Sequence, residues 1–565
     1  MRFFPIFAFA LLLPLTAASA QFWARPPGAP KPVQYGPPAT EPDSPNPQQA
    51  PAAPAAKPDA QAPASTATDA EVPRSAPPPG LASSLGGSGD TGTDSIGILP
   101  ARDTDFERTT WRYTSFATVL DLLGRLPDRI DSAAEHELAK NLLVSIADAP
   151  SGDDGGSRLL ELRVRKLLAM GNVADAAALA RAAPGLPGDA DLARSEVEAE
   201  LLSGQVESAC IDLRSFASIL TDPASQNALA LCRQSAGETS ESDAPPLDVA
   251  SLGAAARISG APLTADPQTS PARMVAAALD AQNDPAQRLE AAFGAGRASA
   301  LYGQFLAKLF AASPAGALST DNGAPADGAG AAALYHAIAQ EGPVDQKVAL
   351  AERGLLSPDG ISDKIGVAMV SPLRSFQPVP ELGPLAQRFA ILFFTVGDTE
   401  AAAPWAELAD ASGSAAQLWP YRVLLKQADV VGIGDWEQAS GLDAPHIARV
   451  LTVLSAFGVT APPAATARVT GDDRPEAPFG DLLGMDKAAR DLHVGETVLR
   501  ALGVLGREGP ARANPLTLRR ALADLDQVSL HSEAHALAFE AITAALYDGR
   551  PPVTTSLSGN NGAGP

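Results

Sequence analysis

The sequence has 565 residues, with 42 basic and 65 acidic side chains and a formal net charge of −23. This excess of acidic residues argues against a nucleic-acid or anionic-membrane surface, because binding phosphate groups needs clustered Lys and Arg. The two cysteines exclude disulfide-dense mini-domains, multi-cysteine zinc modules and Fe–S ferredoxins. At about 150 residues per domain, the length allows three or four domains.

The first twenty residues have the pattern of a secretory signal peptide. Met1 and Arg2 give a short positive start, and residues 3–15 are apolar apart from two prolines. Ala18 and Ala20 form a small-x-small cleavage pattern, so residues 1–20 are predicted to be removed by cleavage between Ala20 and Gln21. An uncleaved anchor is the alternative, but this apolar run is shorter than the roughly 20 residues that span a bilayer. We therefore expect a protein of the periplasm or a secreted protein, without a transmembrane span.

A Pro/Ala/Gly-rich linker is predicted over residues 21–105. It holds seventeen prolines within 21–80, and such a segment buries too little apolar surface to offset its chain entropy. We therefore expect disorder here, and also in a tail of similar composition at 549–565. The linker either extends the reach of the folded part or docks a partner; a solvated linker with no partner is the alternative.

The folded part is predicted to be all-α and to begin near Phe106. Apolar residues recur at helical spacing, first at Phe116, Val119, Leu120 and Leu123, and Ser132 with Glu135 forms a capping box. Period-two strand patterns with hairpin turns are absent. The predicted segments are helical repeats at 106–236, a linker-like break at 237–270, continued helical repeats at 271–461, a loop at 462–480 and C-terminal helices at 481–548.

One short pattern recurs after 33 residues, close to the period of a helix–turn–helix repeat. Its residues are Gly171, Val173 and Ala176 in the first copy and Gly204, Val206 and Ala209 in the second. The glycine permits a left-handed turn residue, and the small alanine lets two helices approach closely. A weaker third copy begins at Gly397.

This pattern resembles the tetratricopeptide repeat (TPR), a unit of 34 residues with Gly-x-aromatic-x-x-Ala at the turn between its two helices. The sequence departs from that family at Val173 and Val206, which stand where it has an aromatic residue, and at Phe216, which stands where it has a small one. The resemblance covers about 157–237 and implies an α-solenoid of TPR-like helical hairpins that presents a surface to another protein. A non-repeating helical packing is the alternative.

The two cysteines are predicted to form a disulfide. A helix over 206–220, a turn at 221–223 and a helix over 224–234 would form a hairpin, with Cys210 and Cys232 each eleven residues from Thr221. The two side chains then lie at the same height, and an exported protein meets oxidising conditions. Two buried reduced cysteines are the alternative.

Motifs for catalysis, cofactors and metals are missing from the sequence. Walker-A and Gly-x-Ser-x-Gly motifs are absent, and a Gly-x-Gly-x-x-Gly match at 87–92 lies in the predicted linker. His531 and His535 have the i, i+4 spacing of metal ligands, but Glu533 lies about 200° around the helix and points away. We therefore predict no catalytic, cofactor-binding or metal-ligating residue, and Trp405, Trp419 and Trp436 are expected to be core or groove residues.

Two functional classes remain from these observations. The first is a non-catalytic scaffold or adaptor in the cell envelope, whose helical array binds a protein or peptide partner of basic or neutral charge. The alternative is a cell-envelope hydrolase or peptidoglycan-active enzyme with an unrecognised site.

Overall fold

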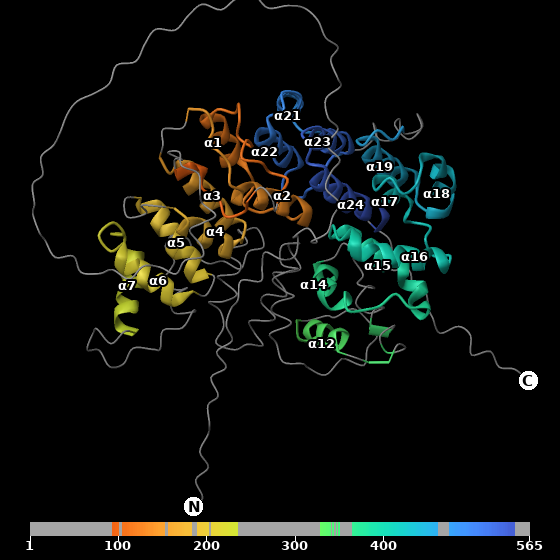
Figure 1. The fold of residues 1–565 in the computed structure, drawn as a ribbon, viewed down its shortest axis with the longest axis horizontal. Helices are drawn as coiled ribbons and strands as arrows, with labels where there is room; N and C mark the ends of the chain where they lie inside the picture. The colour runs from red at the N-terminus through yellow and green to blue at the C-terminus, as the bar shows by residue number, and fades with distance from the viewer. Residues whose placement is uncertain are drawn as a thin grey trace, which may run out of the picture. The chain divides into compact units, whose positions relative to one another are not determined.

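A computed structural model describes residues 93–100, 104–152, 156–183, 189–202, 205–235, 328–340, 342–343, 346, 349–350, 364–460 and 474–547. These residues belong to the second of two units, 1–90 and 91–565, into which the chain divides. The expected signal peptide and cleavage site, the break at 237–270 and the tail at 549–565 lie outside the described residues. Every regular element in the described part is helical, apart from two isolated β-bridges, which confirms the all-α class (Figure 1).

The N-terminal helices follow one another closely along the chain. They are η2 (Thr93–Ser95), α1 (Phe116–Arg125), α2 (Ala133–Val144), α3 (Arg158–Ala169), α4 (Val173–Arg181), α5 (Ala190–Leu202), α6 (Val206–Ser215) and α7 (Pro223–Ser235). From α3 to α7 each helix packs against the next, and α3 also packs against α5. Half of the expected capping box is present at α2, where Ser132 Oγ accepts a hydrogen bond from the backbone N–H of Glu135 at 3.1 Å. The Glu135 carboxylate is buried and makes no return bond to Ser132.

Residues 93–100 correct the expected linker over 21–105, because they are part of the fold. The buried carboxylate of Asp94 accepts hydrogen bonds from the backbone N–H groups of Leu159 (3.2 Å) and Leu160 (2.7 Å), at the start of α3. Asp94 therefore caps the N-terminus of α3 from outside the helix. Its negative charge is favourable there, because the helix dipole is positive at the N-terminus. Arg163 on α3 is buried and donates to the carbonyl oxygens of Ile96, Leu143 and Ser145 at 2.5, 2.6 and 2.9 Å. These polar contacts could not be predicted from the sequence, because they follow no periodic pattern of hydrophobic residues.

The remaining described helices form the second half of the fold. They are α12 (Gly328–Ala339), α14 (Lys364–Leu373), η6 (Pro380–Leu382), α15 (Gly383–Thr395), α16 (Thr399–Ala411), α17 (Trp419–Leu424), η7 (Val430–Gly432), α18 (Ile433–Ser440), α19 (Ala444–Ser455), α21 (Phe479–Arg490), α22 (Val494–Leu505), α23 (Pro515–Gln527) and α24 (His531–Tyr547). Helix α24 packs against α15, α17, α19 and α23, and also against α2 from the N-terminal half. Glu540 on α24 accepts hydrogen bonds from Ser132 Oγ (2.8 Å) and the backbone N–H of Ala134 (3.1 Å), so it lies at the N-terminus of α2.

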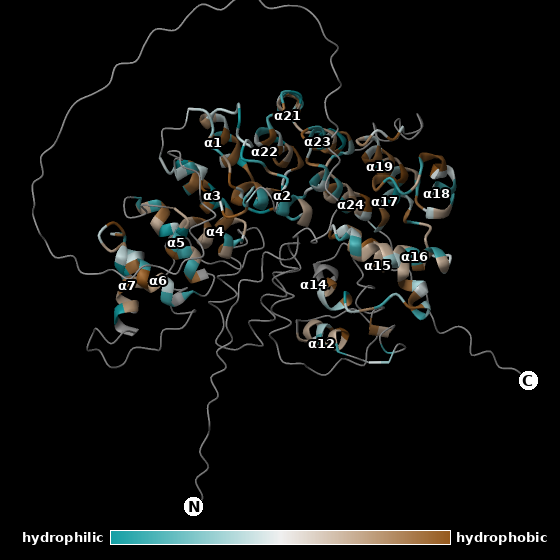
Figure 2. Ribbon diagram, viewed as in Figure 1, coloured by the Kyte–Doolittle hydropathy of each residue, from teal (hydrophilic) through white to brown (hydrophobic). Residues whose placement is uncertain are grey.

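The described residues build two hydrophobic cores. The larger core runs from Phe106 to Leu546 and draws on helices of both halves. The smaller core consists of α5, α6 and α7 side chains and includes both cysteines. Helix α5 serves both, since Leu192 and Ala199 belong to the larger core while Val197 belongs to the smaller. The helices carry both hydrophobic and hydrophilic residues, as expected for helices that bury one face in a core (Figure 2).

Candidate functional site

The first predicted repeat turn joins α3 to α4. Gly171 has φ +86°, in the left-handed region that favours glycine, and its N–H donates to Leu168 O at 2.9 Å. Val173 is the first residue of α4, and Ala176 is fully buried where α3 and α4 pack together. Gly397, in the weaker third copy, also has a positive φ and lies between α15 and α16.

The second repeat turn joins α5 to α6. Gly204 lies outside the described residues, and Val206 is the first residue of α6. Ala209 is fully buried in the smaller core, where its small side chain allows the helices to pack closely. The N–H of Gln205 donates to Glu200 O at 2.8 Å, which closes the end of α5.

The predicted disulfide between Cys210 and Cys232 is confirmed. It joins α6 to α7, with the two Cα atoms 5.5 Å apart. The expected helix ends are wrong, because α6 stops at Ser215 instead of continuing to residue 220, and Pro223 is the first residue of α7 instead of a turn residue. Asp222 explains the second difference, since its side chain accepts the N–H of Ser225 at 2.9 Å and caps α7.

Three carboxylates meet between α5 and α6. Glu196 and Glu200 lie one turn apart on α5 and Asp212 lies on α6, and one oxygen from each is within 4.8 Å of the others. Glu196 is 2% exposed and Glu200 is fully buried, while Asp212 is partly exposed. Arg181, at the end of α4, places Nε 3.3 Å from Glu200 Oε1 and donates through Nη2 to Gln205 Oε1 at 2.8 Å. Among the described residues, this is the one cluster whose ligand atoms converge in this way.

Burial makes two of these carboxyl groups hold protons near neutral pH. Burial, and then the charge of Asp212, raise the pKa of Glu196 to about 7, against the lowering effect of Arg181. Burial, together with the charge of Asp212 and a hydrogen bond to it, raises the pKa of Glu200 to about 8. Burial raises both pKa values because the low-dielectric interior disfavours the ionised form of a carboxyl group.

This arrangement allows proton storage or cation binding. A carboxylic acid beside a carboxylate is the pair used to cleave glycosidic bonds. Such a pair must touch its substrate, whereas Glu196 and Glu200 are enclosed by the helices. The sequence holds a signal for half of the cluster, the i, i+4 spacing of the two glutamates on α5. Asp212 and Arg181 join them only through the packing of α4, α5 and α6.

The histidine pair on α24 takes part in separate contacts. His531 Nδ1 lies 2.6 Å from Asp526 Oδ1, and the His535 ring lies 5.0 Å from that of Phe457. Between them, Glu533 has its pKa raised to about 8, by burial and by the nearby charge of Asp105. The short contact of His531 is therefore to a carboxylate, and that of His535 is to an aromatic ring.

The tryptophans are packed among other aromatic rings. Trp405 stacks on Phe389, with the ring centroids 4.0 Å apart, and Trp419 lies 5.3 Å from Trp436. Trp405 and Trp436 are buried, and Trp419 Nε1 donates to Asp429 O at 3.1 Å. Trp405 and Trp436 are therefore core residues, and Trp419 is partly buried and packs against the core.

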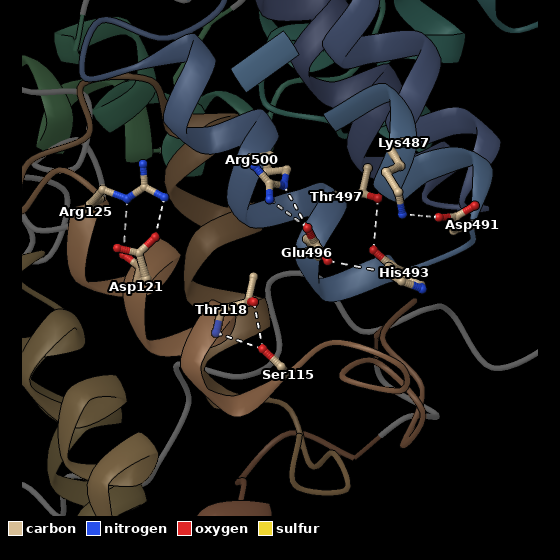
Figure 3. A network of polar contacts seen from close by, with 10 residues as sticks. All are labelled: Ser115, Thr118, Asp121, Arg125, Lys487, Asp491, His493, Glu496, Thr497 and Arg500. Carbon is tan, nitrogen blue, oxygen red and sulfur yellow. Dashed lines mark hydrogen bonds and ion pairs between the residues drawn. The ribbon is translucent and has the colours of Figure 1, made fainter. Parts of the chain in front are cut away.

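A second polar network lies along α21 and α22, beside α1 (Figure 3). Glu496 Oε1 accepts from Arg500 Nε at 2.9 Å, and Glu496 Oε2 lies 3.4 Å from His493 Nδ1. Lys487 pairs with Asp491 at 2.6 Å at the end of α21. All these pairs are three or four residues apart on one helix or at its end, so the network stabilises the two helices locally.

None of the helices in the described ranges is both long enough and apolar enough to cross a bilayer. No protein-family model matches the chain, and no curated protein or solved structure is similar to it.

Proposed function

We propose that the protein is an exported, non-catalytic helical-repeat adaptor that binds a protein or peptide partner in the cell envelope. The observation that carries the proposal is the packing of α3 to α7, in which each helix contacts the next and α3 also contacts α5. Contact between alternate helices is what stacked TPR-like hairpins of an α-solenoid produce. Such stacks leave an extended surface that commonly binds a segment of another protein.

Charge and redox chemistry support the other parts of the proposal. The net charge of −23 favours a basic or neutral partner and a binding strength that falls as salt is added. The disulfide between Cys210 and Cys232 supports export, because disulfides persist in oxidising compartments.

Export is tested by N-terminal sequencing of the full-length gene product recovered from outside the cytoplasm. The expected first residue is Gln21, and an Ala18→Lys variant should accumulate as the uncleaved precursor, because cleavage requires a small residue at that position. An exported chain that still begins with Met1 would contradict this part.

Partner binding is tested by site-specific photocrosslinking in intact cells. A photoreactive amino acid replaces Ile211 on α6, which is 59% exposed, or Leu483 on α21, which is 50% exposed and serves as the matched control. The expected result is one defined partner crosslinked from Ile211 and absent from Leu483. That partner should then bind the purified full chain, more weakly as salt increases. Equal crosslinking from both positions would contradict a partner surface on the repeats.

The hydrolase alternative is tested with purified peptidoglycan. The proposal expects no bond cleavage by the full chain and no difference between it and a Glu200→Gln variant. Cleavage that disappears in Glu200→Gln would overturn the adaptor function, since that residue belongs to the cluster of converging carboxylates.

A further inference from the structure

The cluster of Glu196, Glu200 and Asp212 has more charge than its surroundings balance. In ionised form the three carboxylates carry three negative charges, and Arg181 contributes one positive charge from 3.3 Å. The net charge of −2 is enclosed between α5 and α6, where unbalanced charge is unfavourable. Either two protons or one divalent cation would make the group neutral.

One oxygen in the cluster favours the cation. Glu196 is 2% exposed, and its Oε2 is buried without any hydrogen-bond donor. Buried polar atoms in proteins nearly always have a partner, so this oxygen calls for one that the protein does not itself provide. A metal ion bound by the cluster would supply such a partner.

We propose that Glu196, Glu200 and Asp212 bind one divalent cation of the calcium type. All three ligands are carboxylate oxygens, the donors that hard cations prefer, and the cluster contains no nitrogen or sulfur ligand. The three oxygens lie within 4.8 Å of one another, close enough to share one ion. Ca²⁺ accepts six to eight oxygen ligands in a flexible arrangement, whereas Mg²⁺ requires a nearly ideal octahedron.

The position of the cluster permits access and gives the ion a structural effect. Asp212 is partly exposed, so the ion enters from the α6 side, and water completes the six to eight oxygens that Ca²⁺ takes. The ligands come from α5 and α6, and the disulfide joins α6 to α7. The ion would therefore extend the crosslinked region over all three helices of the smaller core.

The experiment is calorimetric titration of the chelator-treated full chain with CaCl₂ at neutral pH. One Ca²⁺ should bind per chain, and MgCl₂ should bind more weakly. Glu196→Gln should weaken calcium binding at least tenfold, whereas Arg181→Gln should strengthen it, because a competing positive charge is lost. The matched control is Asp486→Asn. Asp486 on α21 interacts with Asp524 on α23, so this variant neutralises one member of another carboxyl pair and should leave calcium binding unchanged.

Folding of each variant is checked by helical circular dichroism and by mapping the Cys210–Cys232 disulfide. Glu196→Gln is expected to fold, because the amide removes a buried charge from an already crowded site. Absence of calcium binding up to about 10 mM would overturn the proposal, because this concentration exceeds the dissociation constants of weak extracellular calcium modules, about 0.1–1 mM. So would equal binding by Glu196→Gln, or a preference for Mg²⁺. The proposal is independent of the adaptor function, which these titrations do not test.

Discussion

Removal of the disulfide should loosen one part of the fold selectively. Cys210 and Cys232 are 22 residues apart in sequence, and a closed loop of this size contributes about 3 kcal/mol in the chain-entropy model. Both cysteines pack in the smaller core of α5, α6 and α7, which is separate from the larger core. A Cys210→Ala/Cys232→Ala double variant should therefore lose stability mainly in these helices.

Hydrogen–deuterium exchange of the full chain measures this locally. A loss of about 3 kcal/mol corresponds to exchange about a hundredfold faster, since each 1.4 kcal/mol is a factor of ten. That acceleration is expected in α6 and α7, and little change is expected in α21 to α24. The reduced wild-type protein is the matched control, because it opens the same loop without deleting either sulfur. Unchanged exchange in α6 and α7, or equal acceleration throughout, would refute the reasoning.

Three further predictions concern stability in denaturant. Burial raises the pKa of Glu533 to about 8, so the folded state binds this proton more tightly than the unfolded state; the resulting stability is complete below about pH 4.3 and lost as pH rises through 8. With chelator present, the urea midpoint should be lower at pH 9 than at pH 6, and a higher midpoint would contradict this. Arg163→Met should cost at least about 3 kcal/mol, because three buried carbonyl oxygens lose their donor; a loss below 1 kcal/mol would count against these bonds. Gly495→Ala should destabilise α22, since its Cβ would clash with the Trp111 ring, whereas Gly503→Ala on the same helix meets open space and should stabilise by about 0.5–1 kcal/mol; equal effects would contradict this packing.

Local patterns were sufficient to predict the helical class and the disulfide. The spacing of Phe116, Val119 and Leu123 reflects one face of a single helix, and all three side chains are buried in α1. The disulfide was likewise predictable from residues close in sequence, and it forms although both helix ends were misplaced. Those ends depend on side-chain caps such as Asp222, whose effect competes with helix propensity over a few residues.

Contacts between distant residues could not be predicted in this way. Glu540 caps α2 from about 400 residues away, and Asp94 caps α3 across some 65 residues. A single carboxylate has no period, and 65 acidic residues offer many candidates for each such position. The carboxylate cluster could not be predicted for the same reason, because Asp212 has no periodic pattern that links it to the two glutamates. Glu196 and Glu200 share a helix face, but only the packing of α5 on α6 brings Asp212 to them.

The adaptor function is tested most directly by hydrogen–deuterium exchange of the full chain with and without the partner captured at Ile211. Binding should slow exchange within 158–235, the helices α3 to α7, and leave exchange within 479–547 unchanged. Protection confined to 479–547, or none in the repeats at saturating partner, would contradict the claim that these helices form the binding surface.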